Sequence, residues 1–242
     1  CGEAMMDYDI SAEMPVVESY LQEGASSLTV KVYSMEAYLK DGYRLSKPVG
    51  GLEIDVNGQS LTETSSGTYS LDLGEDTIRE NQRYDMQFAY SGKSVEGSAT
   101  VPAPVCGLRV VPDSLVQSSS WYFMDSSDTA EVTVSWDDVD NSYYQVYIES
   151  PNTTDMPSLG IFGSRMMQPF RGNSYRATAR DFRSPGTHRI HVYRVGRDYA
   201  ELYGRVSSSD LSNPVSFIRN AFGIFTSLSV AKANVRVYEG EE

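Results

Sequence analysis

Hydrophobic and polar residues alternate in short runs along most of the chain. In the stretches 28–32 and 69–73 every second residue is apolar, which places one side chain in two on a core face. Helical periodicity is scarce. The pattern predicts strands over residues 16–21, 28–34, 52–56, 59–64, 68–73, 84–90 and 94–101 in the first half, and over 108–111, 131–136, 143–149, 175–179, 188–195, 203–206 and 235–238 in the second.

Turn residues separate several of these predicted strands. Asn57-Gly58 stands between two of them and is a strong hairpin signal, because a type I′ turn needs positive φ at both central residues. Ser91-Gly92 is expected to join the last pair of the first half in the same way. Two prolines within residues 102–104 then end the final strand, since proline cannot donate to a ladder. A domain boundary is predicted at this point.

The chain is expected to be all-β, with two tandem immunoglobulin-like or fibronectin type III-like sandwich domains. The 17 Tyr and the frequent Ser, Thr and Val suit a pleated, half-buried surface. The predicted domains cover residues 15–103 and 104–242, and residues 1–14 form an acidic tether. Trp136, followed by two Asp and a tyrosine-rich strand, resembles the early strands of a fibronectin type III sandwich. In this interpretation Trp136 is buried between two sheets.

The charge of the chain limits its possible partners. The formal net charge is −13. Residues 1–103 carry 7 Lys and Arg against 17 Asp and Glu, whereas residues 104–242 carry 13 against 16. A protein that binds nucleic acid needs a basic face to neutralise phosphates. No nucleic-acid partner is therefore expected.

The two cysteines, Cys1 and Cys106, suggest a membrane anchor rather than a disulfide framework. A first-position Cys is typical of a mature bacterial lipoprotein, and two or more acyl chains on it would give stable anchoring. Cys106 would then be a small buried apolar residue. The alternatives are an arbitrary boundary at Cys1 and a disulfide between the two cysteines. The best apolar run, 221–231, is shorter than the roughly 18 to 20 residues of a membrane span.

No constellation in the sequence predicts catalysis, a metal or a cofactor. His188 and His191 are the only histidines, and strand positions three apart face opposite sides. Zinc binding or a histidine-based triad is therefore not expected, and no Gly-x-Ser-x-Gly motif is present. Asp137, Asp138 and Asp140 resemble a calcium loop but lack the Gly and distal Glu of an EF-hand. A solvated turn is the favoured interpretation.

Arginines are concentrated in the second half of the chain. Residues 165–205 hold nine Arg and three acidic residues, and Arg and aromatic residues are enriched in recognition surfaces. One hypothesis is a site for an anionic glycan, a peptide or a partner protein. Its candidate residues are Arg171, Arg176, Arg180, Arg183, Phe162 and Phe170. The alternative is that these arginines pair with acids of the first domain.

The predicted connection over residues 151–172 is unusually long for a sandwich. It contains three Met and two Phe among Gly and Pro. Such a connection is usually functional or packs on a neighbour, and Met and aromatic side chains can form an adaptable binding surface. It could equally cover the core or the junction between the domains.

Several short motifs are informative together: the stretches 15–21, 28–30, 67–69 and 101–102 in the first half and 136–138, 143–144, 212–214 and 220–225 in the second. They resemble a family of two-domain Bacteroidetes surface lipoproteins of unassigned chemistry. The resemblance implies immunoglobulin-like domains, attachment to the outer membrane and a gene beside a TonB-dependent receptor. Glu3, Asp7 and Asp9 are similar to the acidic signal that exports such lipoproteins to the cell surface. The family offers no catalytic residues to carry over.

The expected function is therefore binding rather than catalysis. We expect a lipid-anchored, surface-exposed outer-membrane protein that assists a TonB-dependent nutrient uptake system and binds a glycan or protein ligand. Adhesion to host or neighbouring cells is the alternative within the same architecture. A glycan-degrading enzyme is the rival class, and a clustered pair of buried carboxylates in a cleft would favour it.

Overall fold

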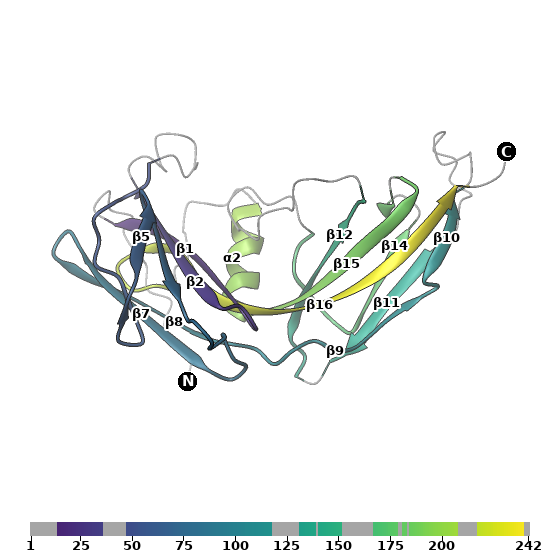
Figure 1. Ribbon diagram of the computed structural model, residues 1–242, viewed down its shortest axis with the longest axis horizontal. Helices are drawn as coiled ribbons and strands as arrows, with labels where there is room; N and C mark the ends of the chain where they lie inside the picture. Colours follow the sequence, from purple (N-terminus) through teal and green to yellow (C-terminus); the bar gives the residue numbers. More distant parts are fainter. Residues whose placement is uncertain are drawn as a thin grey trace. The chain divides into compact units, whose positions relative to one another are not determined.

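The protein is all-β, as predicted, and consists of β-sandwich units (Figure 1). The computed structural model describes residues 14–35, 47–117, 131–138, 140–151, 167–178, 181–182, 184–207 and 217–239. The chain divides into two compact units. The first holds the described residues of Cys1–Ala103 and Gly196–Leu228, and the second holds those of Pro104–Ser158, Arg165–Val195 and Ser229–Glu242.

The first unit is a sandwich of two sheets. One sheet has the order β16-β1-β2-β6-β5, with strands β16 (Phe222–Glu239), β1 (Pro15–Gln22), β2 (Ser27–Ser34), β6 (Thr68–Asp72) and β5 (Thr62–Ser65). The other has the order β4-β3-β7-β8, with strands β4 (Gln59–Ser60), β3 (Asp55–Val56), β7 (Arg83–Tyr90) and β8 (Lys93–Thr100). Inward side chains of both sheets, among them Val30, Tyr69, Met86 and Val95, form one buried core.

The second unit is a sandwich of a three-stranded sheet and part of the nine-stranded sheet to which β16 belongs. The first sheet has the order β14-β11-β9, with strands β14 (Ser174–Thr178), β11 (Glu131–Asp137) and β9 (Cys106–Val111). The second has the order β13-β12-β15-β16, with strands β13 (Phe170–Arg171), β12 (Tyr143–Glu149) and β15 (Gly186–Val195), while β10 (Ser114–Gln117) pairs with β16 in parallel. Trp136 is 2% exposed in the shared core. Its predicted burial between the sheets is confirmed.

Both predicted hairpin turns are present. Asn57 and Gly58 have φ values of 52° and 79°, and Ser91 and Gly92 have values of 46° and 74°. The first turn joins β3 to β4, which pair through Val56 and Gln59. The second joins β7 to β8, which pair over eight residue positions from Arg83 to Tyr90.

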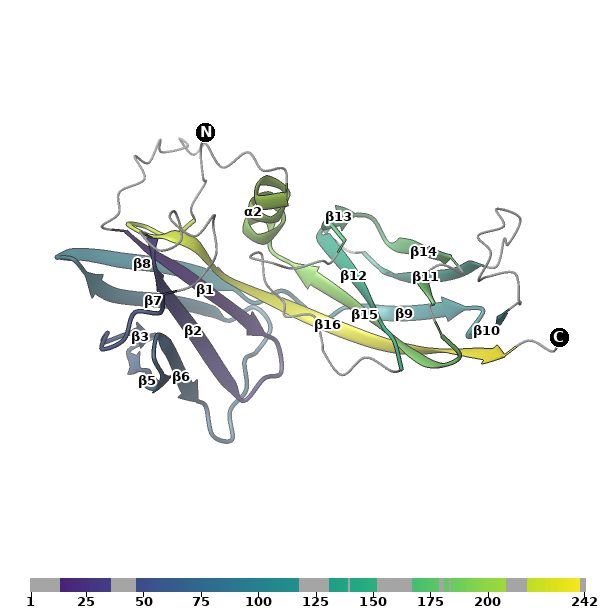
Figure 2. The same ribbon diagram turned by 90° about the horizontal axis from the view of Figure 1, so that it is seen from above.

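Strand β16 is much longer than the predicted strand at 235–238. It spans 18 residues, and its first part pairs in parallel with β1 from Val16 opposite Phe222 to Gln22 opposite Leu228 (Figure 2). Residues 222–229 are buried without alternation, which is the pattern of a strand covered on both faces. This is why the apolar run near residue 225 gave no period-2 signal.

Gly223 permits the close approach of β16 to β1. Its φ is +103°, and a Cβ atom there would overlap the Val17 carbonyl oxygen. Any other residue would have to displace the backbone of β1. The sequence prediction assigned Gly196–Leu228 to the second domain, whereas the structure groups this stretch with the first unit, because Ile218, Ala221 and Phe225 belong to the first unit's core.

Two further sequence predictions were wrong. The strand expected at 203–206 lies within helix α2 (Arg197–Ser207), in which Tyr199, Leu202 and Tyr203 are buried. Their i, i+3, i+4 spacing is helical. Cys106, expected to be buried, is exposed at the start of β9, where its thiol donates to the Pro104 carbonyl oxygen at 3.6 Å. No helix in the described part of the chain is long and apolar enough to cross a bilayer.

Candidate functional site

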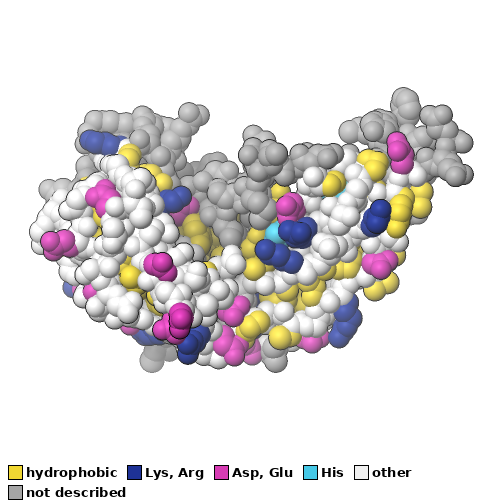
Figure 3. Space-filling view, viewed as in Figure 1, with side chains coloured by type: hydrophobic (Ala, Val, Ile, Leu, Met, Phe, Trp, Pro, Cys, Tyr) yellow, Lys and Arg dark blue, Asp and Glu magenta, His cyan; other side chains and the backbone are white. Residues whose placement is uncertain are grey.

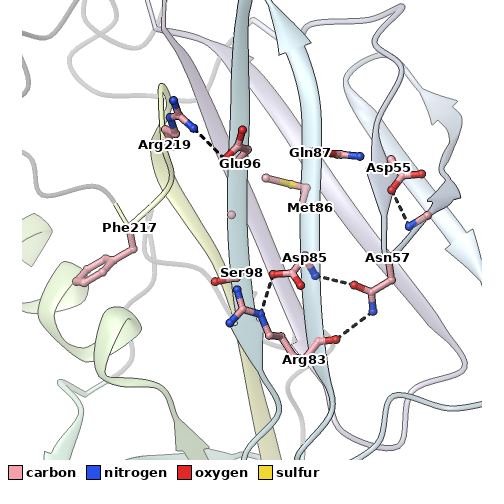
Figure 4. A pocket seen from close by; sticks show the side chains of 12 residues that line it. Asp55, Asn57, Arg83, Asp85, Met86, Gln87, Glu96, Ser98, Phe217 and Arg219 are labelled. Atoms are coloured by element: carbon pink, nitrogen blue, oxygen red, sulfur yellow. Dashed lines mark hydrogen bonds and ion pairs between the residues drawn. The ribbon is translucent and has the colours of Figure 1, made fainter.

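The outer face of the β4-β3-β7-β8 sheet carries a groove of about 520 Å³ (Figure 4). Along β7, exposed and buried residues alternate strictly: Arg83, Asp85 and Gln87 point outward, whereas Tyr84 and Met86 point into the core. The neighbouring strand β8 alternates in the same way, so its Glu96 and Ser98 are also exposed. The strand period thus places one row of polar side chains beside another.

Hydrogen bonds fix the β3-β4 turn at one side of this groove. The Asn57 side-chain amide donates to the Arg83 carbonyl oxygen at 3.0 Å, and its oxygen accepts from the Asp85 amide at 2.8 Å. The Asp55 carboxylate accepts from the Gly58 amide at 2.7 Å. The Arg83 guanidinium pairs with the Asp85 carboxylate at 2.8 Å, and Figure 4 shows Arg83, Asp85 and Asn57 joined by these contacts, with the Asp55 contact apart from them.

A segment from near the end of the chain borders the groove on its other side. Arg219 and Glu96 exchange two backbone hydrogen bonds of 2.8 and 3.3 Å, and their side chains form an ion pair at 3.2 Å. The Asn220 side-chain amide donates to the Ser94 carbonyl oxygen at 2.7 Å. Phe217, at the rim, is 41% exposed. The edge of β8 is therefore occupied at this point, and Phe217 lies at the rim with its ring pointing away from the rows on β7 and β8 (Figure 4).

The charges in the groove compensate one another almost completely. Two arginines, Arg83 and Arg219, are each paired with a carboxylate, and Asp55 adds one further acid. Hydrogen bonds from Ser94 and Arg219, together with the positive charge of Arg219, lower the pKa of Glu96. Glu96 is thus held ionised, which suits a hydrogen-bond acceptor and does not suit a general acid.

A second pocket of about 360 Å³ also lies in the first unit. Its lining includes the apolar side chains of Leu28, Val56 and Leu71. Asp76 and Arg79 also line it and form an exposed ion pair of 2.8 Å. This pocket places polar groups beside part of the core, but it lacks the rows of outward side chains found on β7 and β8.

The described members of the predicted arginine site make contacts within their own unit. The Arg171 guanidinium lies 4.5 Å from the centre of the Tyr143 ring, and Arg176 pairs with Glu131 at 3.4 Å. Phe170 packs against the core beside Trp136. Arg180, Arg183 and Phe162, like Cys1 and most of the 151–172 connection, lie outside the described residues. The proposed recognition role of this set stays a prediction.

The two histidines are buried in different surroundings. His188 packs edge-on against Phe182, and neither ring nitrogen has a hydrogen bond of normal geometry. His191 bonds the Glu149 carboxylate at 2.8 Å and stacks on Tyr193. Burial lowers the pKa of both histidines, although the Gly186 carbonyl and Glu149 partly oppose this effect. Burial also raises the pKa of Tyr193 to about 12.

Other candidates for metal or active-site chemistry find no support in the described ranges. No three His, Cys, Asp or Glu side chains come together there as a metal site. Asp138, one member of the calcium-loop resemblance, instead accepts hydrogen bonds from the Ser142 amide and the Tyr144 hydroxyl. On the viewed face of the second unit, basic side chains lie beside a histidine (Figure 3); Arg189 and Lys232 both act electrostatically on His191.

Sequence reasoning missed the groove on the first unit. One signal was available: the alternation Arg83-Tyr84-Asp85-Met86-Gln87 predicts a strand with three hydrogen-bonding side chains on its outer face. Nothing in the sequence indicated that Phe217 and Arg219 would lie beside it. Their position depends on a contact between residues more than 120 positions apart.

The strand orders define the chain as a protein of the immunoglobulin-like and fibronectin type III-like sandwich class. Solved structures similar to it include the chicken CNTN1 FN1-FN3 domains, at 12% identity, 90% coverage of this chain, 65% of that chain and a TM-score of 0.27. A titin fragment gives 11% identity, coverages of 94% and 66%, and a TM-score of 0.24. Domains 4–9 of surface layer protein SbsC give 12% identity, coverages of 95% of this chain and 32% of that chain, and a TM-score of 0.25.

The chain thus spans about two thirds of the first two of these structures and about a third of the third. Such TM-scores describe a loose likeness, so the assignment to the class depends on strand order and core. No protein-family model matches the chain, and the search among curated proteins found no relative. The resemblance to the lipoprotein family stays a prediction.

Proposed function

We propose that the protein is a non-catalytic binding module whose ligand contacts the outer face of the β4-β3-β7-β8 sheet. One observation carries the proposal: Arg83, Asp85 and Gln87 stand in a row on one strand, in a groove whose rim includes Phe217. Concave sites with a few convergent polar groups are the usual form of binding sites. Because sandwich folds serve many functions, the proposal depends on this site and not on the fold.

The carboxylates of the groove favour binding over glycoside hydrolysis. A hydrolase needs one carboxyl group with a raised pKa as general acid. Asp85 and Glu96 have side chains 57% and 46% exposed and are paired with arginines. The pKa of Glu96 is lowered rather than raised.

A blocking substitution tests the proposed face. Ser98→Trp places a bulky ring among the outward side chains, whereas Ser65→Trp adds the same ring on exposed strand β5 of the other sheet. The tagged full chain would be used to capture proteins from an outer-membrane fraction of the source cells and to probe an array of glycans. We expect a partner retained by wild type and by Ser65→Trp to be lost by Ser98→Trp. Equal retention by all three proteins would overturn the proposal.

The finer version of the proposal is a surface-exposed, lipid-anchored outer-membrane protein that assists a TonB-dependent uptake system. Its support is the resemblance of short motifs described above. Gentle detergent extraction of the tagged protein tests it: co-purification of a TonB-dependent receptor is expected, and recovery of the protein alone would overturn it. Adhesion to cells would use the same face. Beads coated with the wild-type protein would then bind cells, and beads coated with the Ser98→Trp variant would not.

A further inference from the structure

We propose that the groove of the first unit binds a neutral oligosaccharide. This inference rests on the binding face proposed above and adds the chemical class of its ligand. It depends on the charges, the hydrogen-bonding groups, the aromatic rim and the occupied strand edge of the groove.

The charges exclude ligands that need a free counter-charge. Arg83 and Arg219 already pair with Asp85 and Glu96, at 2.8 and 3.2 Å. Asp55 leaves the lining with a surplus of one negative charge. An anionic ligand would therefore compete with these carboxylates for the arginines, and it would meet net repulsion. A ligand without charge pays neither cost.

The outward side chains offer donors and acceptors together, as sugar hydroxyls require. Guanidinium groups donate, carboxylates accept, and the amide of Gln87 does both. Asp85 lies opposite Ser98, and Gln87 opposite Glu96, across the β7-β8 pair. Successive outward positions on a strand are about 7 Å apart. The outward side chains therefore offer contact points spread along the strands, which suits an extended ligand better than a single small molecule.

The rim supplies an apolar surface for the C–H face of a sugar ring. Phe217 lies on the segment beside β8, is 41% exposed and points away from the two polar rows (Figure 4), so a ligand that reaches it extends past the rim of the groove. An exposed aromatic ring next to polar groups gives large contact area at low entropic cost. Aliphatic ligands are not favoured, because the remaining lining is mostly polar.

The backbone arrangement argues against an extended peptide added to the sheet. Strand addition requires free N–H and C=O groups along an edge. At Glu96 these groups already bond Arg219, at 2.8 and 3.3 Å. A ligand at this place must therefore use side chains, as an oligosaccharide does.

The test uses the full chain on an array of neutral and uronic-acid oligosaccharides, followed by calorimetry with the neutral glycan that binds best. Phe217→Ala and Gln87→Ala are each expected to weaken binding about tenfold or more, with unchanged melting temperatures. Tyr238→Ala removes a comparably exposed aromatic ring of the second unit, 47% exposed, and is expected to leave affinity unchanged. Affinity should change little between 50 and 500 mM salt, because the ligand carries no charge.

The outcomes separate this inference from the proposed function. Binding of only acidic glycans or of protein partners, weakened by Phe217→Ala and Gln87→Ala, would overturn the neutral ligand and support the binding face. Glycan binding that none of these variants changes would overturn both. A complete absence of glycan binding would overturn the inference, and the Ser98→Trp capture experiment would then decide on the face.

Discussion

The two sandwich units differ in what completes them and in what they bury. The first unit takes in a strand segment and helix α2 from late in the chain, and it partly buries the carboxyl groups of Glu18 and Asp198, whose pKa values burial raises. The second unit buries two histidines whose pKa values burial lowers. The stability of the two units is therefore expected to change in opposite directions on acidification. The first unit also depends on residues distant in sequence to complete its fold.

Gly223→Ala should produce the largest effect and should act on the first unit. The new Cβ would overlap the Val17 carbonyl oxygen, at a backbone with φ of +103°. We expect a loss of about 3 kcal/mol in the free energy of unfolding, seen as faster amide hydrogen exchange in β1 and β8. Gly74→Ala is the control, because its φ is +66° and nothing lies within 4 Å; it should cost about 1 kcal/mol. Equal costs would show that the close approach is unimportant.

Acid should destabilise the second unit first. A histidine whose folded pKa is lowered binds fewer protons when folded, so its contribution is present above the unfolded pKa of 6.5 and is lost as the pH falls below it. The groups acting on His191 are Glu149, Tyr147, Tyr193, Arg189 and Lys232. Urea unfolding followed by tryptophan fluorescence checks this at pH 7.5 and 5.5, because both tryptophans lie within residues 104–242.

His188→Leu should reduce this acid sensitivity. The substitution removes two buried nitrogens that lack hydrogen bonds of normal geometry, so a gain of about 1 kcal/mol at pH 7.5 is expected. His191→Gln is the comparison, because it removes titration while keeping a donor for Glu149. If both variants retain the full fall in stability between pH 7.5 and 5.5, buried histidines are not its cause.

Acid should act on the first unit in the opposite direction. Burial raises the pKa of Glu18, although the Tyr20 hydroxyl bonds it at 3.0 Å. A carboxyl group with a raised folded pKa binds protons more readily when folded, so stability rises as the pH falls through that pKa toward 4.5. Glu18→Gln should add about 0.5 kcal/mol at pH 7 and weaken this dependence. Exchange of the β1 amides at pH 7 and 5 measures it, and an unchanged pH dependence would contradict it.

Arg219→Ala should have the smallest effect on stability. Its ion pair with Glu96 joins side chains 65% and 46% exposed, and exposed pairs contribute little. A loss of about 0.3 kcal/mol in the free energy of unfolding is expected by chemical denaturation, since the backbone bonds to Glu96 remain. A loss above about 1 kcal/mol would show that this side chain holds the late segment in place.

Local patterns in the sequence predicted local structure well. The positive φ values required at Asn57-Gly58 follow from residue type alone, and the alternation around Val30 gives one face of a sheet. The sequence did not show that Leu61 marks a change of sheet, where β4 pairs with β3 and β5 pairs with β6. Residues 59–60 and 62–65 carry the same strand pattern, so the pattern does not show which strand each of them pairs with.

Non-local contacts account for the rest of what was missed. The run near Phe225 is buried on both faces, and without alternation it shows neither its partner nor its orientation. Tyr199, Leu202 and Tyr203 have helical spacing, but three apolar positions are too few to distinguish a helix from a strand. The groove could not be predicted for the same reason. Arg219 contacts Glu96 only when the segment around residue 219 folds against β8.

The parallel pairing of β1 with β16 has a mechanical consequence. Seven consecutive residue pairs join the two strands, and both strands run in the same direction. If the chain is pulled from before β1 and from after β16, the two strands are drawn past each other along their lengths. All of the hydrogen bonds between them then share the load, instead of opening one at a time. The first unit would resist stretching through this shear connection, and single-molecule force spectroscopy should find it weakened by Gly223→Ala.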